Sequence, residues 1–351
     1  MAAFRFFSKS NIVAGLLLVA VVACHSEKES AESYQLNVPQ GFPKPPIPEK
    51  NQLTKLRIDL GRELFFDPIL SRDSTVSCAS CHHPEKAFSD IEALSRGVDD
   101  SLGMRNAPAL VNVVYGKSFF RDGGVPTLEQ QILVPFDDHR EFDLNMLYAV
   151  ERLERHPRYS KMSKEAYGRG PDPFTLTRSL AAFERTLISG NSPYDQFTYQ
   201  GKQDALTASE KRGLALFEGD KLQCRGCHAG FNFTNELYEN NGLKAVYADT
   251  GRARITSKPE DVGKFKVPTL RNVELTGPYM HDGSVKSLAA VVEHYQSGGA
   301  GHVNQSQLIA GFELNEQEKR DLINFLKSLT DTSFVANKNH QHPADYSPIF
   351  P

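Results

Sequence analysis

Apolar residues in this chain recur at the spacing of α-helices and not at that of β-strands. Capping-box patterns, in which two side chains satisfy backbone amides of a first helical turn, occur at 127–130, 207–210 and 315–318. The last of them precedes an apolar helix face made of Leu322, Phe325, Leu326 and Leu329. The pattern therefore predicts an all-α fold whose apolar stripes pack in a core.

The N-terminal segment follows a different pattern. Arg5 and Lys9 precede an apolar run over residues 12–23, which is about half the length that a membrane-spanning helix needs. We interpret residues 1–24 as a signal peptide. The residues that end it resemble a lipobox, so we expect acylation of Cys24; ordinary signal cleavage beside a chance cysteine is the alternative.

The remainder divides by composition. Residues 25–50 are polar and then rich in proline, a composition that builds no core and suits a flexible tether. We expect two domains, 51–200 and 201–332, joined by a linker at 192–203, and a C-terminal tail over 333–351.

Length, net charge and cysteine count exclude some classes of protein. A chain of 351 residues allows two domains of ordinary size. The formal net charge of -3, without a basic cluster, argues against nucleic-acid binding, because phosphates require a positive surface. The five cysteines are too few for a disulfide scaffold, and four of them form two close pairs.

Each close pair belongs to a C-x-x-C-H motif. The two motifs consist of Cys78, Cys81 and His82 and of Cys224, Cys227 and His228. This spacing lets two thiols bond to haem vinyl groups while the histidine ligates the iron. A four-thiolate zinc site would leave both histidines unexplained, and a thioredoxin-like pair needs a βαβ context that is missing. The motifs predict two covalent c-type haems, which are attached outside the cytoplasm, in agreement with export.

The two halves repeat one another. Residues 107–132 align without a gap with residues 267–292, at an offset of 160, and share Pro, Leu, Asn-Val and Asp-Gly. Residues 60–65 before the first haem motif resemble residues 212–217 before the second. We therefore predict two cytochrome c-like haem domains related by internal duplication.

The order of further motifs resembles the bacterial di-haem cytochrome c peroxidase family, including its MauG-like branch. The matching stretches are LGRELFFDPILS, AFSD after the first haem motif, RNAP, FFRDGG and FKVPTLRNVELTGPYMHDG. The resemblance implies that the N-terminal haem is the peroxide site and that the C-terminal haem supplies electrons to it. It also implies a distal pocket of Gln131, Pro135 and Glu141.

Glu141 has a chemical role to fill at such a site. Cleavage of the O–O bond requires a proton to move from one peroxide oxygen to the other, and a carboxylate within reach can accept and return it. The alternatives are a solvated glutamate in a charged run, or His139 as the base. The family spacing favours Glu141.

The sequence departs from the family pattern at the first haem. A histidine that blocks the peroxidatic iron in the classical peroxidases is replaced by Val98, in the register set by Arg105 and Asn106. Because valine cannot ligate iron, we expect this haem to be open in the resting oxidised protein. His83 and Met104 are weaker candidates for a ligand that would block this iron.

A second departure concerns the C-terminal haem, where the family register places Tyr295 instead of a methionine. The repeat offset independently pairs Tyr295 with Pro135. A tyrosine here resembles the MauG-like branch, and phenolate ligation would favour ferric iron and lower its potential. His294 is the alternative ligand.

A third departure is Arg121, which stands where the family has a tryptophan between the haems. Arginine can pair with haem propionates but is not a redox relay. The resemblance also implies an inter-domain Ca²⁺ held by the Asn106 side chain and the carbonyls of Thr276 and Pro278, completed by water.

Three functions follow. The first is reduction of hydrogen peroxide to water, with electrons from a small periplasmic donor such as a cytochrome c or a cupredoxin. The second is a MauG-like oxidase that acts on a partner protein or small substrate, and the third is a non-catalytic electron carrier. We expect a periplasmic protein that contacts the membrane only through a lipid anchor, and the resemblance allows a homodimer.

Overall fold

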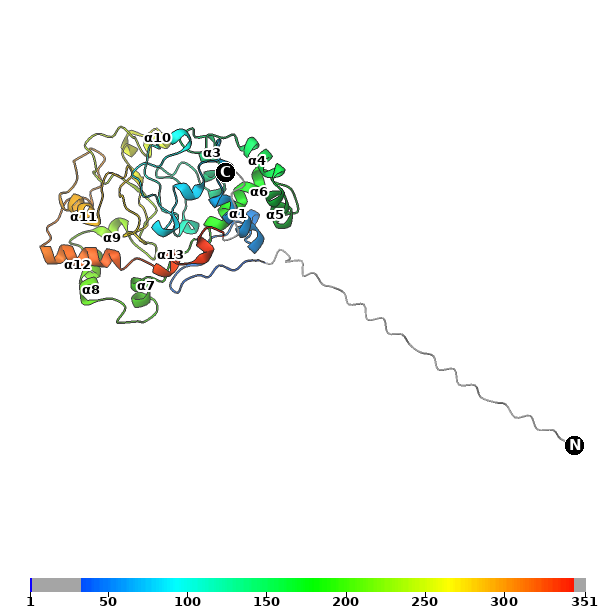
Figure 1. The fold of residues 1–351 in the computed structure, drawn as a ribbon. Helices are drawn as coiled ribbons and strands as arrows, with labels where there is room; N and C mark the ends of the chain where they lie inside the picture. The colour runs from blue at the N-terminus through cyan, green and yellow to red at the C-terminus, as the bar shows by residue number, and fades with distance from the viewer. Residues whose placement is uncertain (2–32, 344–351) are drawn as a thin grey trace.

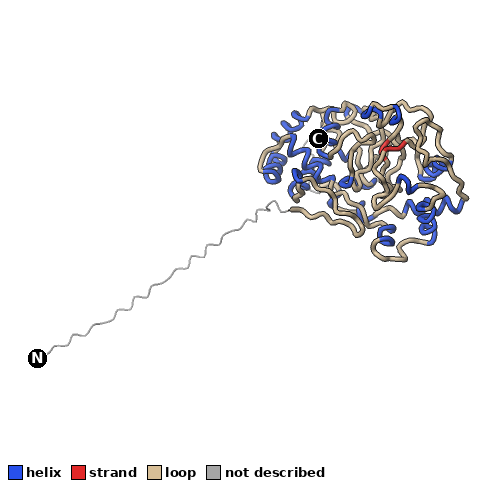
Figure 2. Tube along the Cα trace, turned by 180° about the vertical axis from the view of Figure 1, so that it is seen from behind, coloured by secondary structure: helices blue, strands red, loops and turns tan. Residues whose placement is uncertain are grey.

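The computed structural model describes residues 33–343 and Met1. The expected signal peptide, Cys24 and the end of the expected tail lie outside the described residues. The described part is helix-rich, with one short antiparallel strand pair and long loops between the helices (Figure 2). None of its helices combines the length and the apolarity that a membrane crossing requires.

Most helices are short. In chain order the elements are α1 (Lys55–Phe66), α2 (Leu128–Gln131), α3 (Leu133–Asp137), α4 (Met146–Arg155), α5 (Pro157–Tyr167), α6 (Pro173–Glu184), α7 (Pro193–Thr198), α8 (Ala208–Glu218), α9 (Cys224–Cys227), β1 (Tyr238–Glu239), α10 (Ala253–Thr256), β2 (Phe265–Lys266), α11 (Leu288–Gln296), α12 (Glu316–Lys327) and α13 (Thr332–Val335).

Two of the three capping boxes predicted from sequence are confirmed, and the third, at α2, has only the bond to the Thr127 side chain. At α8 the Glu210 N–H donates to Thr207 Oγ1 at 3.3 Å, while the Thr207 N–H donates to the Glu210 carboxylate at 2.7 Å. Asn315 and Glu318 make the same reciprocal pair at α12, with both bonds at 2.9 Å. Thr127 caps α2 through the Gln130 N–H. These bonds satisfy amides that a first helical turn leaves unpaired.

Two pairs of packed helices, α1 with α6 and α8 with α12, lie on opposite sides of the molecule (Figure 1). Each pair contributes to a separate apolar cluster. A Cβ added at Gly61 would lie 1.8 Å from the Ser179 carbonyl oxygen, and one added at Gly213 would lie 1.9 Å from that of Asp321. Glycine therefore allows both pairs of backbones to approach closely.

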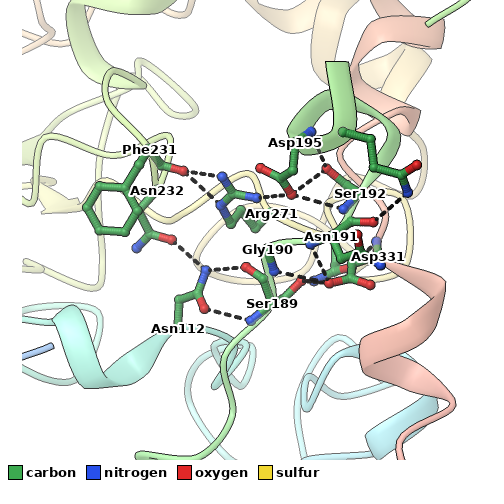
Figure 3. A network of polar contacts seen from close by, with 12 residues as sticks. Asn112, Ser189, Gly190, Asn191, Ser192, Asp195, Phe231, Asn232, Arg271 and Asp331 are labelled. Carbon is green, nitrogen blue, oxygen red and sulfur yellow. Dashed lines mark hydrogen bonds and ion pairs between the residues drawn. The ribbon is translucent and has the colours of Figure 1, made fainter. Parts of the chain in front are cut away.

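A buried polar network joins the two sides (Figure 3). Its ion pair links Arg271 Nη1 to Asp195 Oδ2 at 2.8 Å, and both side chains are fully buried. Asn112 Nδ2 donates to Asn232 Oδ1 at 3.0 Å. The Asp331 carboxylate accepts from backbone N–H groups of the segment that follows α6. Because buried polar groups are costly to leave unpaired, this network fixes how the two sides meet.

Residues 192–203 differ from the expected linker. They contain α7, whose first turn is capped by reciprocal bonds between Ser192 and Asp195. Asp195 also pairs with Arg271, so the segment belongs to the buried contact between the two sides. Spacing along the chain gave no sign of that ion pair.

The proline-rich stretch before α1 also packs on the body, although we expected a tether through residue 50. The ring of Phe42 lies 4.8 Å from that of Phe231 and 6.2 Å from that of Tyr115, and the Arg271 guanidinium lies over it at 4.5 Å. Leu36 and Ile47 also pack against the apolar cluster around α1 and α6, so several apolar side chains hold this extended segment in place.

The described part of the expected tail returns to α1. Phe334 of α13 joins the apolar cluster around α1 and α6, and His340 is buried. Arg62 of α1 donates from Nε to the Gln341 carbonyl at 2.9 Å. Residues 334–341 therefore stabilise the N-terminal side of the molecule.

Candidate functional site

A cavity of about 780 Å³ runs between the two sides and holds both C-x-x-C-H motifs. Every residue proposed from sequence for haem attachment, distal chemistry or cation binding lines it, apart from Cys24, which lies outside the described residues. Residues as far apart in the chain as Cys78 and Tyr295 thus line one cavity. No cysteine of the two motifs is in a disulfide.

The first motif occupies a 3-10 turn, Cys78–Ser80, followed by His82. The Nδ1 atom of His82 lies 2.9 Å from the Phe88 carbonyl oxygen, an arrangement that leaves Nε2 as the ligating atom. Burial lowers the pKa of His82, which keeps the imidazole neutral as metal ligation requires.

The second motif repeats this geometry in α9. His228 Nδ1 lies 3.0 Å from the Phe233 carbonyl oxygen, and burial lowers the pKa of His228 as well. In both motifs a backbone carbonyl on the next loop therefore sets the ring orientation and tautomer.

The proposed distal residues of the first site come from α2, α3 and the turn that follows. Gln131 ends α2, Pro135 lies within α3, and Glu141 follows after a turn in which its N–H donates to the Asp138 carbonyl at 2.9 Å. Burial raises the pKa of Glu141 to about 7, and the charge of Asp138 adds to the rise. A carboxyl with this pKa can both accept and return a proton near neutral pH.

His139, the alternative base, has a side chain that is 76% exposed and does not line the cavity. Val98 is buried, and its N–H donates to the Glu141 carbonyl at 3.0 Å. His83 faces Glu85 and Asp90 and not the cavity. Of the weaker ligand candidates, only Met104 lines the cavity.

At the second site the structure distinguishes the two ligand candidates. Tyr295 of α11 lines the cavity, and burial raises the pKa of its hydroxyl to about 12. His294 does not line the cavity, and its Nε2 lies 2.9 Å from the Asn241 carbonyl oxygen. Of these two neighbours on α11, Tyr295 is the one that lines the cavity.

The chain is similar in sequence to di-haem proteins. A family model described as di-haem cytochrome c peroxidase matches residues 55–204. The methylamine utilization protein MauG of Methylorubrum extorquens is 40% identical over 293 residues, which cover 81% of this chain and 81% of that protein. This chain belongs to the di-haem cytochrome c peroxidase family.

Other members of the family carry peroxidase names. Cytochrome c peroxidase Ccp of Escherichia coli is 34% identical over 317 residues, which cover 86% of this chain and 65% of that protein. A solved structure, of a MauG-like protein associated with microbial copper homeostasis, is 32% identical with a TM-score of 0.84, covering 89% of this chain and 99% of that one. The family therefore confirms a di-haem protein, while its members' names divide between MauG and peroxidase.

The residues present fit the two covalent haems that the family implies. Each motif offers two thiols outside any disulfide and an imidazole whose Nδ1 faces a carbonyl oxygen. The cavity walls include apolar residues from both clusters, among them Phe65, Leu128 and Leu288. Such walls suit the faces of a porphyrin.

The Ca²⁺ site that the resemblance implied fits less well. Asn106, Thr276 and Pro278 all line the cavity. Both oxygens of Asn106, however, accept hydrogen bonds from Arg121: the side-chain Oδ1 from Nη2 at 2.6 Å and the backbone oxygen from Nε at 3.0 Å. The guanidinium of Arg121 therefore already binds Asn106 Oδ1, the one side-chain oxygen in the expected calcium site.

Sequence analysis missed Glu184, at the C-terminal end of α6. Its side chain is buried and lines the cavity near Cys78, and its Oε2 atom has no hydrogen-bond partner among the described residues. Burial raises its pKa to about 8, so the carboxyl is predominantly neutral at pH 7. Its position after the apolar stretch Leu180–Phe183 was the only signal in the sequence, and it did not point to the cavity.

Proposed function

We propose that this protein reduces hydrogen peroxide to water at its first haem site, with electrons that a small periplasmic donor, a cytochrome c or a cupredoxin, delivers through the second. The observation that carries the proposal is the presence of Gln131, Pro135 and Glu141 in the same cavity as His82. A non-catalytic electron carrier needs no proton-transfer group beside its haem. Of the three functions, electron transfer alone is therefore the least favoured.

The chemistry divides between cofactor and chain. The bound haem supplies the iron at which peroxide is reduced. Glu141 accepts a proton from one peroxide oxygen and returns it to the other, which makes water the leaving group. The Gln131 amide is placed to orient the peroxide by a hydrogen bond, and Pro135 limits the space for water. Two electrons and two further protons complete the conversion of one peroxide into two waters.

A stopped-flow experiment tests this proposal. Hydrogen peroxide is mixed with the fully oxidised holoprotein, and a reduced small cytochrome c is then supplied. We expect peroxide consumption without prior reduction, because Val98 leaves no blocking ligand, and oxidation of two donor equivalents per peroxide. An oxidised protein whose electron paramagnetic resonance spectrum contains only low-spin haem, and which ignores peroxide, would refute it.

Tyr295 and Val98 favour a second function, a MauG-like oxidation of a partner protein or small substrate. Tyrosine ligation stabilises oxidised iron and makes electron transfer from a donor to the second haem less favourable. Under this alternative, peroxide alone would produce an optical change that persists without donor and decays when the substrate is added. Rapid donor oxidation with peroxide would contradict it.

We also propose that the chain consists of two haem domains produced by internal duplication, with the boundary near residue 200. The support is the repeated sequence together with two close helix pairs and two similar histidine environments. Export to the periplasm, a lipid on Cys24 and a homodimer complete the proposal. Labelled fatty-acid incorporation that is lost in Cys24→Ser, and light scattering of the purified protein, test the last two.

A further inference from the structure

Arg121 lines the cavity that holds both haem motifs. Its backbone is held from the C-terminal side, since the Lys266 N–H of β2 donates to its carbonyl at 2.7 Å. Its side chain holds Asn106, whose own N–H donates to the His281 carbonyl at 2.9 Å. The guanidinium is therefore fixed at a contact between the two sides of the molecule.

The surroundings of Arg121 do not suit a divalent cation. Calcium takes about six to eight oxygen ligands, usually including carboxylates. The nearby carboxylates are already paired with cations: Asp122 and Asp249 both bind Arg105, at 2.7 and 2.6 Å, and Asp282 binds Lys244. The described residues contain no group of three or more His, Cys, Asp or Glu arranged to hold a metal ion.

The guanidinium itself keeps its charge. Burial lowers the pKa of Arg121 to about 10, and the positive charge of Arg105 contributes to the fall, while Asp282 opposes it. At neutral pH the side chain is still protonated. A calcium ion on Asn106 Oδ1 would have to sit beside Nη2, which lies 2.6 Å from that oxygen, and so two cations would compete for one ligand.

We propose that the Arg121 guanidinium is the fixed cation between the two haem sites, in place of the divalent metal expected from the family resemblance. It stabilises the Asn106 contact by two hydrogen bonds and presents a permanent positive charge to both haems. A positive charge nearby disfavours the ferric relative to the ferrous state, so Arg121 raises both haem potentials. The inference rests on the two haems of the proposed function but not on its peroxide chemistry.

Metal analysis of the purified holoprotein is the first test and needs no variant. We expect calcium far below one ion per chain, and unchanged electron paramagnetic resonance spectra and haem potentials after dialysis against EGTA. One tightly held calcium per chain, whose removal changes the spectra or potentials and whose return restores them, would overturn the proposal.

Redox titration of variants is the second test. Arg121→Gln should shift both haem potentials to lower values, while Arg121→Lys, which keeps the charge but not the planar two-bond geometry, should recover most of the shift. The control is Arg254→Gln, which removes the same charge from a cavity-lining side chain that is 61% exposed. Its effect should be smaller, because solvent screens an exposed charge.

Equal shifts in Arg121→Gln and Arg254→Gln, or none in either, would refute a special role for Arg121. If Arg121→Gln binds haem poorly, the metal analysis and Arg121→Lys still decide the question. If the protein proves inactive toward peroxide but lacks calcium and shows the predicted potential shifts, then the proposed function fails and this inference stands.

Discussion

The two sides of the cavity share a proximal design and differ on the distal side. His82 and His228 each turn Nδ1 toward a carbonyl oxygen, that of Phe88 or Phe233, at 2.9 and 3.0 Å. The two haem sites are therefore built to ligate iron in the same way. Any difference in chemistry between the two sites must therefore come from the distal residues, on the other side of each haem.

Those distal residues are different in kind. At the repeat offset of 160, Gln131, Pro135 and Glu141 of the first side correspond to Val291, Tyr295 and Gly301 of the second. At these three positions the first side thus has a carboxyl group suited to proton transfer, whereas the second has a ligand candidate and no carboxyl group. This difference agrees with the proposal that the first haem site reacts with peroxide and that the second exchanges electrons with it.

Loss of the proton-transfer group should have the largest effect. Glu141→Gln keeps size and a hydrogen-bond acceptor but cannot accept and return the proton, so peroxide turnover should fall by about a hundredfold or more. Haem content and the ferric spectrum should not change. Steady-state peroxide consumption and optical spectra measure both.

His139→Gln is the matched control, because His139 is the exposed alternative base. Its turnover should stay near that of the native protein. If His139→Gln abolishes turnover and Glu141→Gln does not, the distal assignment is wrong.

Replacement of Tyr295, the distal candidate on the second side, should have the next largest effect, on the potential of the second haem. Tyr295→Met replaces a phenol by a thioether, which stabilises ferrous iron, and should raise the second haem's potential by on the order of 0.1 V or more. Redox titration followed by optical spectroscopy measures the shift. An unchanged potential here, with a shift in His294→Gln, would identify His294 as the ligand.

The two glycine contacts test whether the sides are separate packing units. Alanine at Gly61 or Gly213 would place Cβ against a carbonyl of the partner helix, so each should lower the free energy of unfolding by about 1–3 kcal/mol. Gly61→Ala should perturb the first haem's spectrum and Gly213→Ala the second's. Equal perturbation of both haems by either variant would show that the sides do not respond separately.

The smallest expected effect is the dependence of the peroxide reaction rate on pH. The pKa of Glu141 is raised to about 7, and only its ionised form can accept the peroxide proton. The rate of reaction with peroxide should therefore rise with pH through about 7 and fall by up to about tenfold per unit below it. Stopped-flow rates across this range measure the profile. A native profile that stays flat would contradict a base role for Glu141, and the Glu141→Gln variant should show no such step.

The sequence determined the features that depend on local spacing. Two C-x-x-C-H motifs indicated the haems, and the capping pairs at Thr207 and Asn315 indicated helices, because such bonds form within a few residues along the chain. The family also followed from the order of motifs, while the distal register stays a prediction. These signals need no knowledge of contacts between distant segments.

Only the tertiary structure decided which distant groups meet. Tyr295 lines the cavity, while His294 contacts the Asn241 carbonyl. The Asn106 side chain accepts a hydrogen bond from Arg121. The Oε2 atom of Glu184 is buried without a hydrogen-bond partner among the described residues. The tertiary structure also packed the proline-rich segment and residues 332–341 against the rest of the molecule. These outcomes depend on helix rotation, burial and long-range ion pairs, which are set by packing between segments and leave no periodic trace in the sequence.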